Sequence, residues 1–549
     1  MRSRFWIILA GVVCAAGVAL AVPKNAAPPR LVVVIVVDQL TPDLLDRLGP
    51  VFTGAFKTFR DRGLRFLQAR HDHALTQTAP GHFVLLSGRH PGPAGVPANE
   101  FYDRTERRIV YSVEDRQSRI LGADGRGASY RNVQATALGD WMKEADSQSL
   151  VYSVAGKDRS AVLLGGQRPD GAIWFHPQAG GFTTSTYYAD TIPKAVQIFN
   201  ARNRVEPFFG KDWQRALKDE KLYRTYAGAD DAPGENMISR DEDSPVFPHR
   251  LTGRPASDGF GAFMAFPWLD ELTVKLARHL IESTRIGLDD HPDLLAVSLS
   301  AFDVLGHAFG PNSQEAMDAA IRVDRELGAF VQFVEQRFGR GRVLLVLTSD
   351  HGVMPLAEVC RSKGLPAARV SAEVKAFRTR LFDELEKKYE SAARLFLFRG
   401  QENIHFDHEE LARRRIDPQD LYEEVRLLAS TETWIAHILD REELLHPRDL
   451  NPVGQQMLHS FHPEKGADLY LIPKPYLITQ GAPRGANHGS PYDYDARVPL
   501  LFYGWQAAPK TANRPVRTVD LAPTLARILG VATPDGLDGT ALEELISEN

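Results

Sequence analysis

LVVVIVVD, residues 31–38, is a run of seven apolar side chains closed by a single acid. An unbroken apolar run of this length is typical of a strand that is buried on both faces of a parallel sheet. Similar runs recur at 294–299, 343–348 and 498–503. With helical patterns between them, these runs predict an α/β fold in which helices flank a large, mostly parallel central sheet.

The rest of the chain divides into helical patterns and two segments of different composition. Apolar periodicity predicts packing helices over 268–284, 313–338 and 521–530, the second of them after the cap candidates Asn312 and Ser313. Residues 166–260 are rich in glycine, aromatic residues and scattered charge, and 356–465 combine charged and mixed helical stretches. We interpret both segments as cap insertions into one α/β domain that spans 31–549.

Metal-binding side chains recur beside the predicted strands. A lone aspartate at a strand end is often only a turn or cap residue, so the argument rests on recurrence. In open α/β sheets the ligand crevice lies outside the carboxyl ends of the strands, where residues distant in sequence meet. Three carboxylates and three imidazoles there suit two closely spaced divalent ions, for which zinc is the best fit. The six residues are Asp38, Asp303, His307, Asp350, His351 and, after the expected strand at 468–473, His488.

A candidate nucleophile lies in LTQTAPGHFVLLSGRHP, residues 75–91. Pro80 suits the first turn of a helix, which places the Thr78 hydroxyl near a helix N-terminus, where backbone dipoles favour an anion. A threonine alkoxide needs such help, and a bound metal would supply more. Two alternatives stay open at this point: Thr78 is an N-cap residue only, or Thr76 is the nucleophile.

The composition and the N-terminal residues limit the cellular location and the binding partners that we expect for this protein. A net charge of −5 over 549 residues gives no basic surplus for nucleic acid or an anionic membrane. Residues 1–21 fit a signal peptide, with Arg2 and Arg4 before an apolar stretch and a small-x-small cleavage site, and 22–30 fit a linker. We therefore expect a periplasmic or secreted protein without a membrane anchor after cleavage. An uncleaved anchor and a lipoprotein cysteine at Cys14 are the alternatives, and the sequence leaves the oligomeric state open.

Taken in order, these motifs resemble the alkaline phosphatase superfamily of two-metal phosphoryl and sulfuryl transfer enzymes. The resemblance runs from 31 to about 530 and leaves the two insertions poorly matched. It implies two Zn²⁺ per chain, one held by Asp38, Asp350 and His351 together with the nucleophile Thr78. The other zinc would be held by Asp303, His307 and His488. The motifs that carry the resemblance are Asp38, TAPGH at 78–82, Asp303-x-x-x-His307, Asp350-His351-Gly352 and His488.

Two further segments indicate the branch of this superfamily. Sulfatases need a convertible Cys or Ser and an arginine, both of which TAPGH lacks, so sulfatase activity is not expected. Asn99, in VPANEFYD, and Lys157 with Arg159, after the apolar stretch at 152–155, resemble the phosphate-binding residues of threonine-nucleophile alkaline phosphatases. A phosphate monoester has more free oxygens than a diester, so an added Lys/Arg pair favours it.

The sequence thus predicts a periplasmic phosphomonoesterase that hydrolyses small-molecule phosphate esters through a phosphothreonine intermediate. A phosphodiesterase or nucleotide pyrophosphatase of the same superfamily is the alternative. A nonenzymatic metal-binding surface protein is the third reading, and the presence of Thr78 together with all six ligands weighs against it.

Overall fold

The structure, a computed structural model, describes residues 27–238, 242–400, 402–480 and 483–546. The predicted signal peptide at 1–21 and most of the predicted linker lie outside these residues. Within the described ranges, no helix combines the length and the apolar character needed to cross a membrane.

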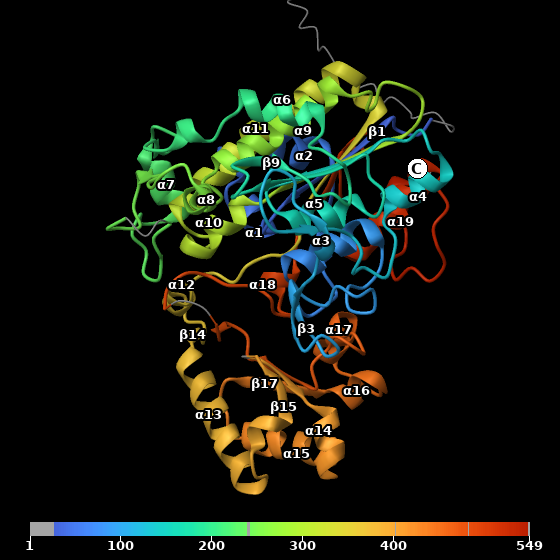
Figure 1. Cartoon of the computed structure of the whole chain (residues 1–549). Helices are drawn as coiled ribbons and strands as arrows, with labels where there is room; N and C mark the ends of the chain where they lie inside the picture. The colour runs from blue at the N-terminus through green and yellow to red at the C-terminus, as the bar shows by residue number, and fades with distance from the viewer. Residues whose placement is uncertain (1–26, 239–241, 401, 481–482, 547–549) are drawn as a thin grey trace, which may run out of the picture.

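A nine-stranded sheet forms the centre of the molecule (Figure 1). Across the sheet, the strands are β21 (Lys510–Arg517), β2 (Leu64–Arg70), β20 (Leu500–Gly504), β13 (Val343–Thr348), β1 (Leu31–Val37), β12 (Asp293–Leu299), β7 (Val151–Ala155), β8 (Gly171–His176) and β9 (Gly181–Thr183). Five of the eight neighbouring pairs are parallel, whereas β20 is antiparallel to both β13 and β2, and β9 is antiparallel to β8.

The predicted mostly parallel α/β sheet is therefore confirmed, but the prediction that 498–503 forms a parallel strand is wrong. The apolar run of β20 shows that both faces of the strand are buried; it carries no information about direction.

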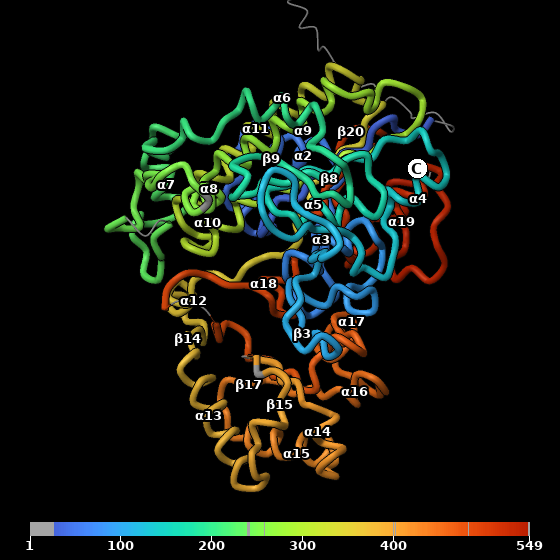
Figure 2. The backbone as a smooth tube through the Cα atoms, in the orientation of Figure 1, coloured from blue at the N-terminus to red at the C-terminus, as the bar shows by residue number. Residues whose placement is uncertain are grey.

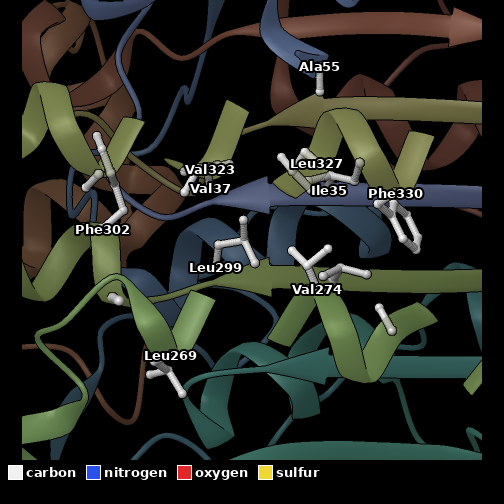
Figure 3. Packing of buried hydrophobic residues seen from close by; sticks show 14 of the residues in the cluster. Ile35, Val37, Ala55, Leu269, Val274, Leu299, Phe302, Val323, Leu327 and Phe330 are labelled. Atoms are coloured by element: carbon white, nitrogen blue, oxygen red, sulfur yellow. The ribbon is translucent and has the colours of Figure 1, made fainter. Parts of the chain in front are cut away.

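Both faces of the sheet are covered, as the composition of β1 requires. Val33 and Ile35 pack into one apolar cluster and Val34 and Val36 into another, because successive side chains of a strand point to opposite faces. Figure 3 shows the first face, where Val323 of α11 lies beside Val37 and Leu327 of the same helix lies beside Ile35. Helices α2 (Ala55–Arg62), α9 (Trp268–Ser283), α10 (Ala301–Phe309) and α11 (Gln314–Phe338) cover this face, and α3 (Thr78–Ser87), α4 (Leu138–Ala145) and α19 (Leu521–Leu529) cover the other.

The helices that flank the sheet include those expected from periodicity. The elements α9, α11 and α19 correspond to the predicted helices at 268–284, 313–338 and 521–530. Ser313 caps α11, since its hydroxyl accepts a hydrogen bond from the Ala316 N–H at 3.0 Å. Within 166–260, β8 and β9 are strands of the central sheet, and α6 (Lys194–Arg202), α7 (Glu220–Ala227) and α8 (Ser257–Phe263) add Phe199 and Tyr223, among others, to the core beneath α9 and α11.

A smaller body, here called the lower lobe, lies below the sheet in Figures 1 and 2. It has its own apolar core, to which Phe377, Leu421 and Trp434 contribute. Its antiparallel sheet contains β15 (Phe396–Arg399), β16 (Asn403–Phe406), β18 (Leu469–Pro473) and β17 (Ile435–Asp440), in that spatial order. Its helices are α13 (Ser371–Lys388), α14 (His408–Arg414), α15 (Pro418–Ala429), α16 (Arg441–Leu445) and α17 (Pro452–Ser460).

Candidate active site

The sheet topology brings the predicted metal ligands to one edge. Strands β7, β12, β1 and β13 are parallel neighbours, so their carboxyl ends lie together. Asp38 directly follows β1, Asp303 lies in the first turn of α10 after β12, and Asp350 follows β13. Because β20 is antiparallel to both its neighbours, β2 runs in the same direction as β13 and leads the chain to α3 at the same edge.

Asp303, His307 and His488 form the first ligand cluster, in which one ligand atom of each lies within 4.8 Å of the others. The Nε2 atoms of His307 and His488 lie 3.4 and 3.6 Å from Asp303 Oδ1. Each ring points its Nδ1 at a backbone carbonyl, of Ala486 at 3.1 Å and of Thr76 at 2.8 Å. A ring that donates from Nδ1 keeps the Nε2 lone pair for a metal, so this cluster has a donor set that suits a divalent metal ion.

His488 reaches this edge by a route that differs from the predicted one. The strand expected before it, β18, belongs to the lower-lobe sheet and pairs with β16 and β17. His488 instead precedes β20, whose antiparallel direction places its amino end where the neighbouring strands have their carboxyl ends. His488 was predicted as a ligand that follows the strand at 468–473, but the strand that positions it is β20, which was not recognised in that role.

Asp38, Asp350 and His82 form a second, fully buried cluster in which one ligand atom of each lies within 4.8 Å of the others, and His351 lies beside Asp350. His351 donates from Nδ1 to the Gly352 carbonyl at 2.9 Å, and its Nε2 lies 3.2 Å from Asp350 Oδ2. Neither His351 Nε2 nor Asp350 Oδ2 has a hydrogen-bond partner in the described part of the chain. Buried polar atoms without partners are costly, and a divalent cation between them would remove that cost.

His82 lies between Asp38 and Asp350 and was not assigned a role from the sequence. Its Nδ1 and Nε2 donate to the Thr78 carbonyl and to Ser298 Oγ, each at 2.9 Å, and Ser298 donates in turn to Asp38. Burial favours the neutral ring, but the carboxylates of Asp38 and Asp350 outweigh burial and raise the pKa of His82 to about 9. Both nitrogens of His82 are engaged by the Thr78 carbonyl and Ser298, so His82 orients the carboxylates while the Nε2 of His351 is left for a metal. Its position one helical turn after Thr78 was the available signal.

Lys157 connects the two clusters. Its Nζ donates to Asp38 Oδ2 at 3.1 Å and to Asp303 Oδ2 at 2.6 Å. Burial opposes the charge of the ammonium, but Asp303 and Asp38 outweigh it and raise the pKa of Lys157. Lys157 is therefore a buried cation within reach of both ligand groups.

Thr78 is the first residue of α3, after the N-cap residue Gln77, and is almost fully buried. Its hydroxyl lies 3.4 Å from Arg159 Nη2. The competing Thr76 donates its hydroxyl to the Ser490 carbonyl at 2.8 Å, which leaves it in a structural contact. Thr78 is thus the threonine whose hydroxyl faces the cationic groups.

Asn99 and Arg159 flank the Thr78 helix start. Asn99 Oδ1 accepts the Ala79 N–H at 2.8 Å, so its amide nitrogen is left to donate elsewhere. Arg159 Nη1 donates to Tyr111 Oη at 3.2 Å, and Tyr111 donates to Asp158 at 2.6 Å, which orients the guanidinium. Tyr111, in β4 (Arg108–Tyr111), carried no signal in the sequence.

A cavity of about 610 Å³ opens beside the first ligand cluster and extends toward the lower lobe. Asn99, His307 and His488 line its inner end, and Phe398 and Tyr470 of the lower lobe line its outer part. This volume is typical of small-molecule sites and leaves room for a group attached to the reacting atom.

Gly81 tests how tightly α3 is held against the second ligand group. A Cβ at this position would lie 1.9 Å from the Asp350 carbonyl oxygen. We expect Gly81→Ala to cost about 1–3 kcal/mol of stability and to lower activity, because the helix that carries Thr78 must move away from Asp350. Thermal unfolding and turnover are the measurements, with Gly261→Ala as control, since no atom lies within 4 Å of a Cβ there. Equal behaviour of the two variants would contradict the close contact.

Comparisons with known proteins identify the family of this chain. The family model for type I phosphodiesterase / nucleotide pyrophosphatase matches residues 32–432. Alkaline phosphatase PafA of Elizabethkingia meningoseptica is 28% identical over 100% of both chains, and alkaline phosphatase PhoK of Sphingomonas is 30% identical over 94% of this chain and 91% of its own.

Solved structures extend the comparison to the fold. The crystal structure of wild-type PafA superposes with a TM-score of 0.87 at 28% identity, over 95% of this chain and 100% of that one. A second PafA structure carries replacements of a threonine, an asparagine, a lysine and an arginine. Murine ectonucleotide pyrophosphatase/phosphodiesterase 5 shares the fold, with a TM-score of 0.50 at 13% identity over 92% of this chain and 97% of that one. The chain therefore belongs to the type I phosphodiesterase/nucleotide pyrophosphatase family of the alkaline phosphatase superfamily.

Proposed function

We propose that this protein is a phosphomonoesterase that hydrolyses small-molecule phosphate esters through a phosphothreonine intermediate at Thr78. The observation that carries the proposal is the position of the Thr78 hydroxyl, 3.4 Å from Arg159 Nη2 at the start of α3, the helix whose His82 lies in one metal-ligand cluster with Asp38 and Asp350. We further propose that the clusters hold two zinc ions. One is held by Asp38, Asp350 and His351, and the other by Asp303, His307 and His488.

The metals and the side chains divide the chemistry. When bound, divalent ions in the two clusters supply Lewis-acid charge beside the attacking and leaving oxygens. Thr78 supplies the oxygen that attacks phosphorus in line with the departing alcohol, and the proton that Thr78 loses passes to that alcohol through solvent. Water then attacks the phosphothreonine, which releases phosphate and restores the Thr78 hydroxyl. The N-terminus of α3 adds partial positive charge, and Asn99, held through its Oδ1, donates its amide N–H to a phosphoryl oxygen.

Lys157 and Arg159 set the preference for a monoester. A monoester dianion carries its charge on three unesterified oxygens, whereas a diester has two and a single charge. The fixed cations of Lys157 and Arg159 therefore favour the transition state of a monoester more than that of a diester. Tyr111 and Asp158 hold the guanidinium in place, so little reorganisation is needed when the substrate binds.

The relatives support this branch of the family. PafA, PhoV, PhoD and PhoK are alkaline phosphatases by name. The four residue types replaced in the PafA variant match Thr78, Asn99, Lys157 and Arg159 in type and order. The family description, in contrast, names phosphodiesterases and nucleotide pyrophosphatases, which makes diester hydrolysis the second candidate.

A comparison of kcat/KM on the zinc-loaded protein tests the proposal. The three substrates are a phosphate monoester, a phosphate diester and a sulfate ester that share one leaving group. We expect the monoester to be preferred by at least about 10²-fold, the range expected when fixed donors to the phosphoryl oxygens act on only one substrate. A preference for the diester would assign the protein to the second candidate function, and a preference for the sulfate would exclude both.

We also propose that the protein acts in the periplasm or outside the cell, on the basis of the signal-peptide pattern at 1–21. Expression of the full chain in a Gram-negative host, followed by fractionation and N-terminal sequencing, is expected to give periplasmic protein beginning at Val22. Cytoplasmic protein with an intact N-terminus would contradict this location.

A further inference from the structure

A second group of metal-binding side chains lies away from the candidate active site. Asp72 follows β2, His90 follows α3, and His459 lies in α17 of the lower lobe. One ligand atom of each lies within 4.8 Å of the other two. The described residues that line the 610 Å³ cavity include none of the three, so this group, here called the junction cluster, is separate from the cavity beside the active site.

The junction cluster lies where the lower lobe meets the central body. His459 donates from Nδ1 to the Asp72 carbonyl at 2.6 Å and accepts the Gly92 N–H on its own carbonyl at 2.9 Å. Its neighbour Ser460 accepts the N–H of Ala74 at 2.9 Å. His459 therefore connects α17 of the lower lobe to the segment before α3, through Asp72, and to the segment after α3, through Gly92.

His459 makes the same kind of backbone hydrogen bond as the proposed active-site ligands, but its Nδ1 is the atom that lies 3.8 Å from Asp72 Oδ2, so the ring must turn to bring Nε2 to an ion. His307, His351 and His488 each donate from Nδ1 to a backbone carbonyl, and His459 does the same toward Asp72. This bond fixes the tautomer that leaves Nε2 with a lone pair.

The other two members of the junction cluster, His90 and Asp72, also have contacts that suit metal ligands. His90 Nε2 lies 3.0 Å from Asp72 Oδ2, and His90 Nδ1 lies 3.5 Å from Asp538 Oδ2, so a carboxylate backs the ring as in many histidine metal ligands. The second carboxylate oxygen of Asp72 is buried and accepts no hydrogen bond from any described residue. Arg517 Nη1, 3.6 Å from Asp72 Oδ2, is the nearby cation, and its other nitrogen is paired with Asp520.

We propose that Asp72, His90 and His459 form a third divalent-metal site, for zinc, that fastens the lower lobe to the central body. Two imidazoles and a carboxylate are a common zinc donor set, with water or the second Asp72 oxygen as fourth ligand. The rings of His90 and His459 are stacked at 3.5 Å and 11°, so one ring must tilt for both nitrogens to face a single ion. The role is structural, since no cluster residue contacts the Thr78 hydroxyl among the described contacts.

Zinc content of the full chain, measured after loading with zinc and removal of free metal, tests the site. We expect three zinc per chain for the unsubstituted protein. His90→Gln and His459→Gln are expected to hold two and to retain monoester turnover within about twofold, because the active-site ligands are unchanged. His446→Gln, which changes a largely exposed histidine of the same lobe, is the control and is expected to keep three.

A variant that lacks the active-site metal ligands tests the third site independently of the proposed function. In a chain with Asp38→Asn and Asp303→Asn, the active-site clusters are disabled, and one zinc is expected to remain. Adding Asp72→Asn, which preserves side-chain shape, is expected to remove it, and the visible absorption of bound Co²⁺ reports the same loss on folded protein. The proposal is overturned if the unsubstituted chain binds no more than two zinc, or if the junction variants keep the zinc content of their parents. The cluster would then be only an ion-pair network around His90, and this conclusion would not depend on which substrate the enzyme hydrolyses.

Discussion

Thr78→Ala is expected to lower kcat for a phosphate monoester by on the order of 10³-fold or more while zinc content stays unchanged. The hydroxyl of Thr78 is the proposed attacking oxygen, and the competing Thr76 hydroxyl is bonded to the Ser490 carbonyl. The six proposed ligands come from other segments, so loss of one hydroxyl leaves their geometry in place. Single-turnover kinetics together with metal analysis measure both parts of this result.

Two companion variants make this test specific. Thr78→Ser keeps a hydroxyl at the start of α3 and is expected to retain much of the activity. Thr76→Ala removes only the contact to Ser490 and is expected to have a smaller effect than Thr78→Ala. If Thr76→Ala were the more damaging change, or if Thr78→Ala turned over at the unsubstituted rate, the nucleophile assignment would be wrong.

The second large effect concerns substrate preference. The double variant Lys157→Ala, Arg159→Ala is expected to reduce kcat/KM for a monoester by about 10²-fold or more, because each cation stabilises charge on an unesterified oxygen. Loss for a diester is expected to be smaller, since a diester offers fewer such oxygens. Steady-state kinetics with a monoester and a diester that share a leaving group measure the difference.

Loss of two positive charges alone must be separated from this effect. Lys194→Ala with Arg202→Ala removes the same charge from the exposed residues of α6 and is expected to leave both reactions unchanged. Lys157 also contacts Asp38 and Asp303, so zinc content of the double variant is measured in parallel. Equal losses for both substrates at full zinc content would remove the basis for the monoester preference.

The sheet was predictable because burial on both faces leaves a clear pattern in a strand. The run at 31–37 is wholly apolar, and the structure places it at the centre with helices on both sides. The direction of each strand could not be predicted in this way, because a buried strand has the same apolar pattern whether it is parallel or antiparallel to its neighbours. The antiparallel β20 was missed for that reason, and with it the route by which His488 reaches the site.

The convergence of candidate site residues was predictable where a charged side chain comes directly after a parallel strand. Asp38, Asp350 and Lys157 come from parallel strand ends, and the structure brings them to one edge. Groups that act through another side chain gave a weaker signal: His82 looks like any helix residue, and Tyr111 lies on a short strand of an unrelated sheet. Their partners are distant in sequence, so only the folded structure identifies them.

Phosphate bound covalently to Thr78 would identify this residue as the nucleophile. The zinc-loaded protein is mixed with a phosphate monoester, quenched in acid within milliseconds, digested and analysed by mass spectrometry. We expect phosphothreonine in the peptide that contains Thr78, and none at Thr76 or in Thr78→Ala. Rapid turnover with no phosphorylated peptide at any quench time, or a phosphate on another residue, would contradict this role of Thr78.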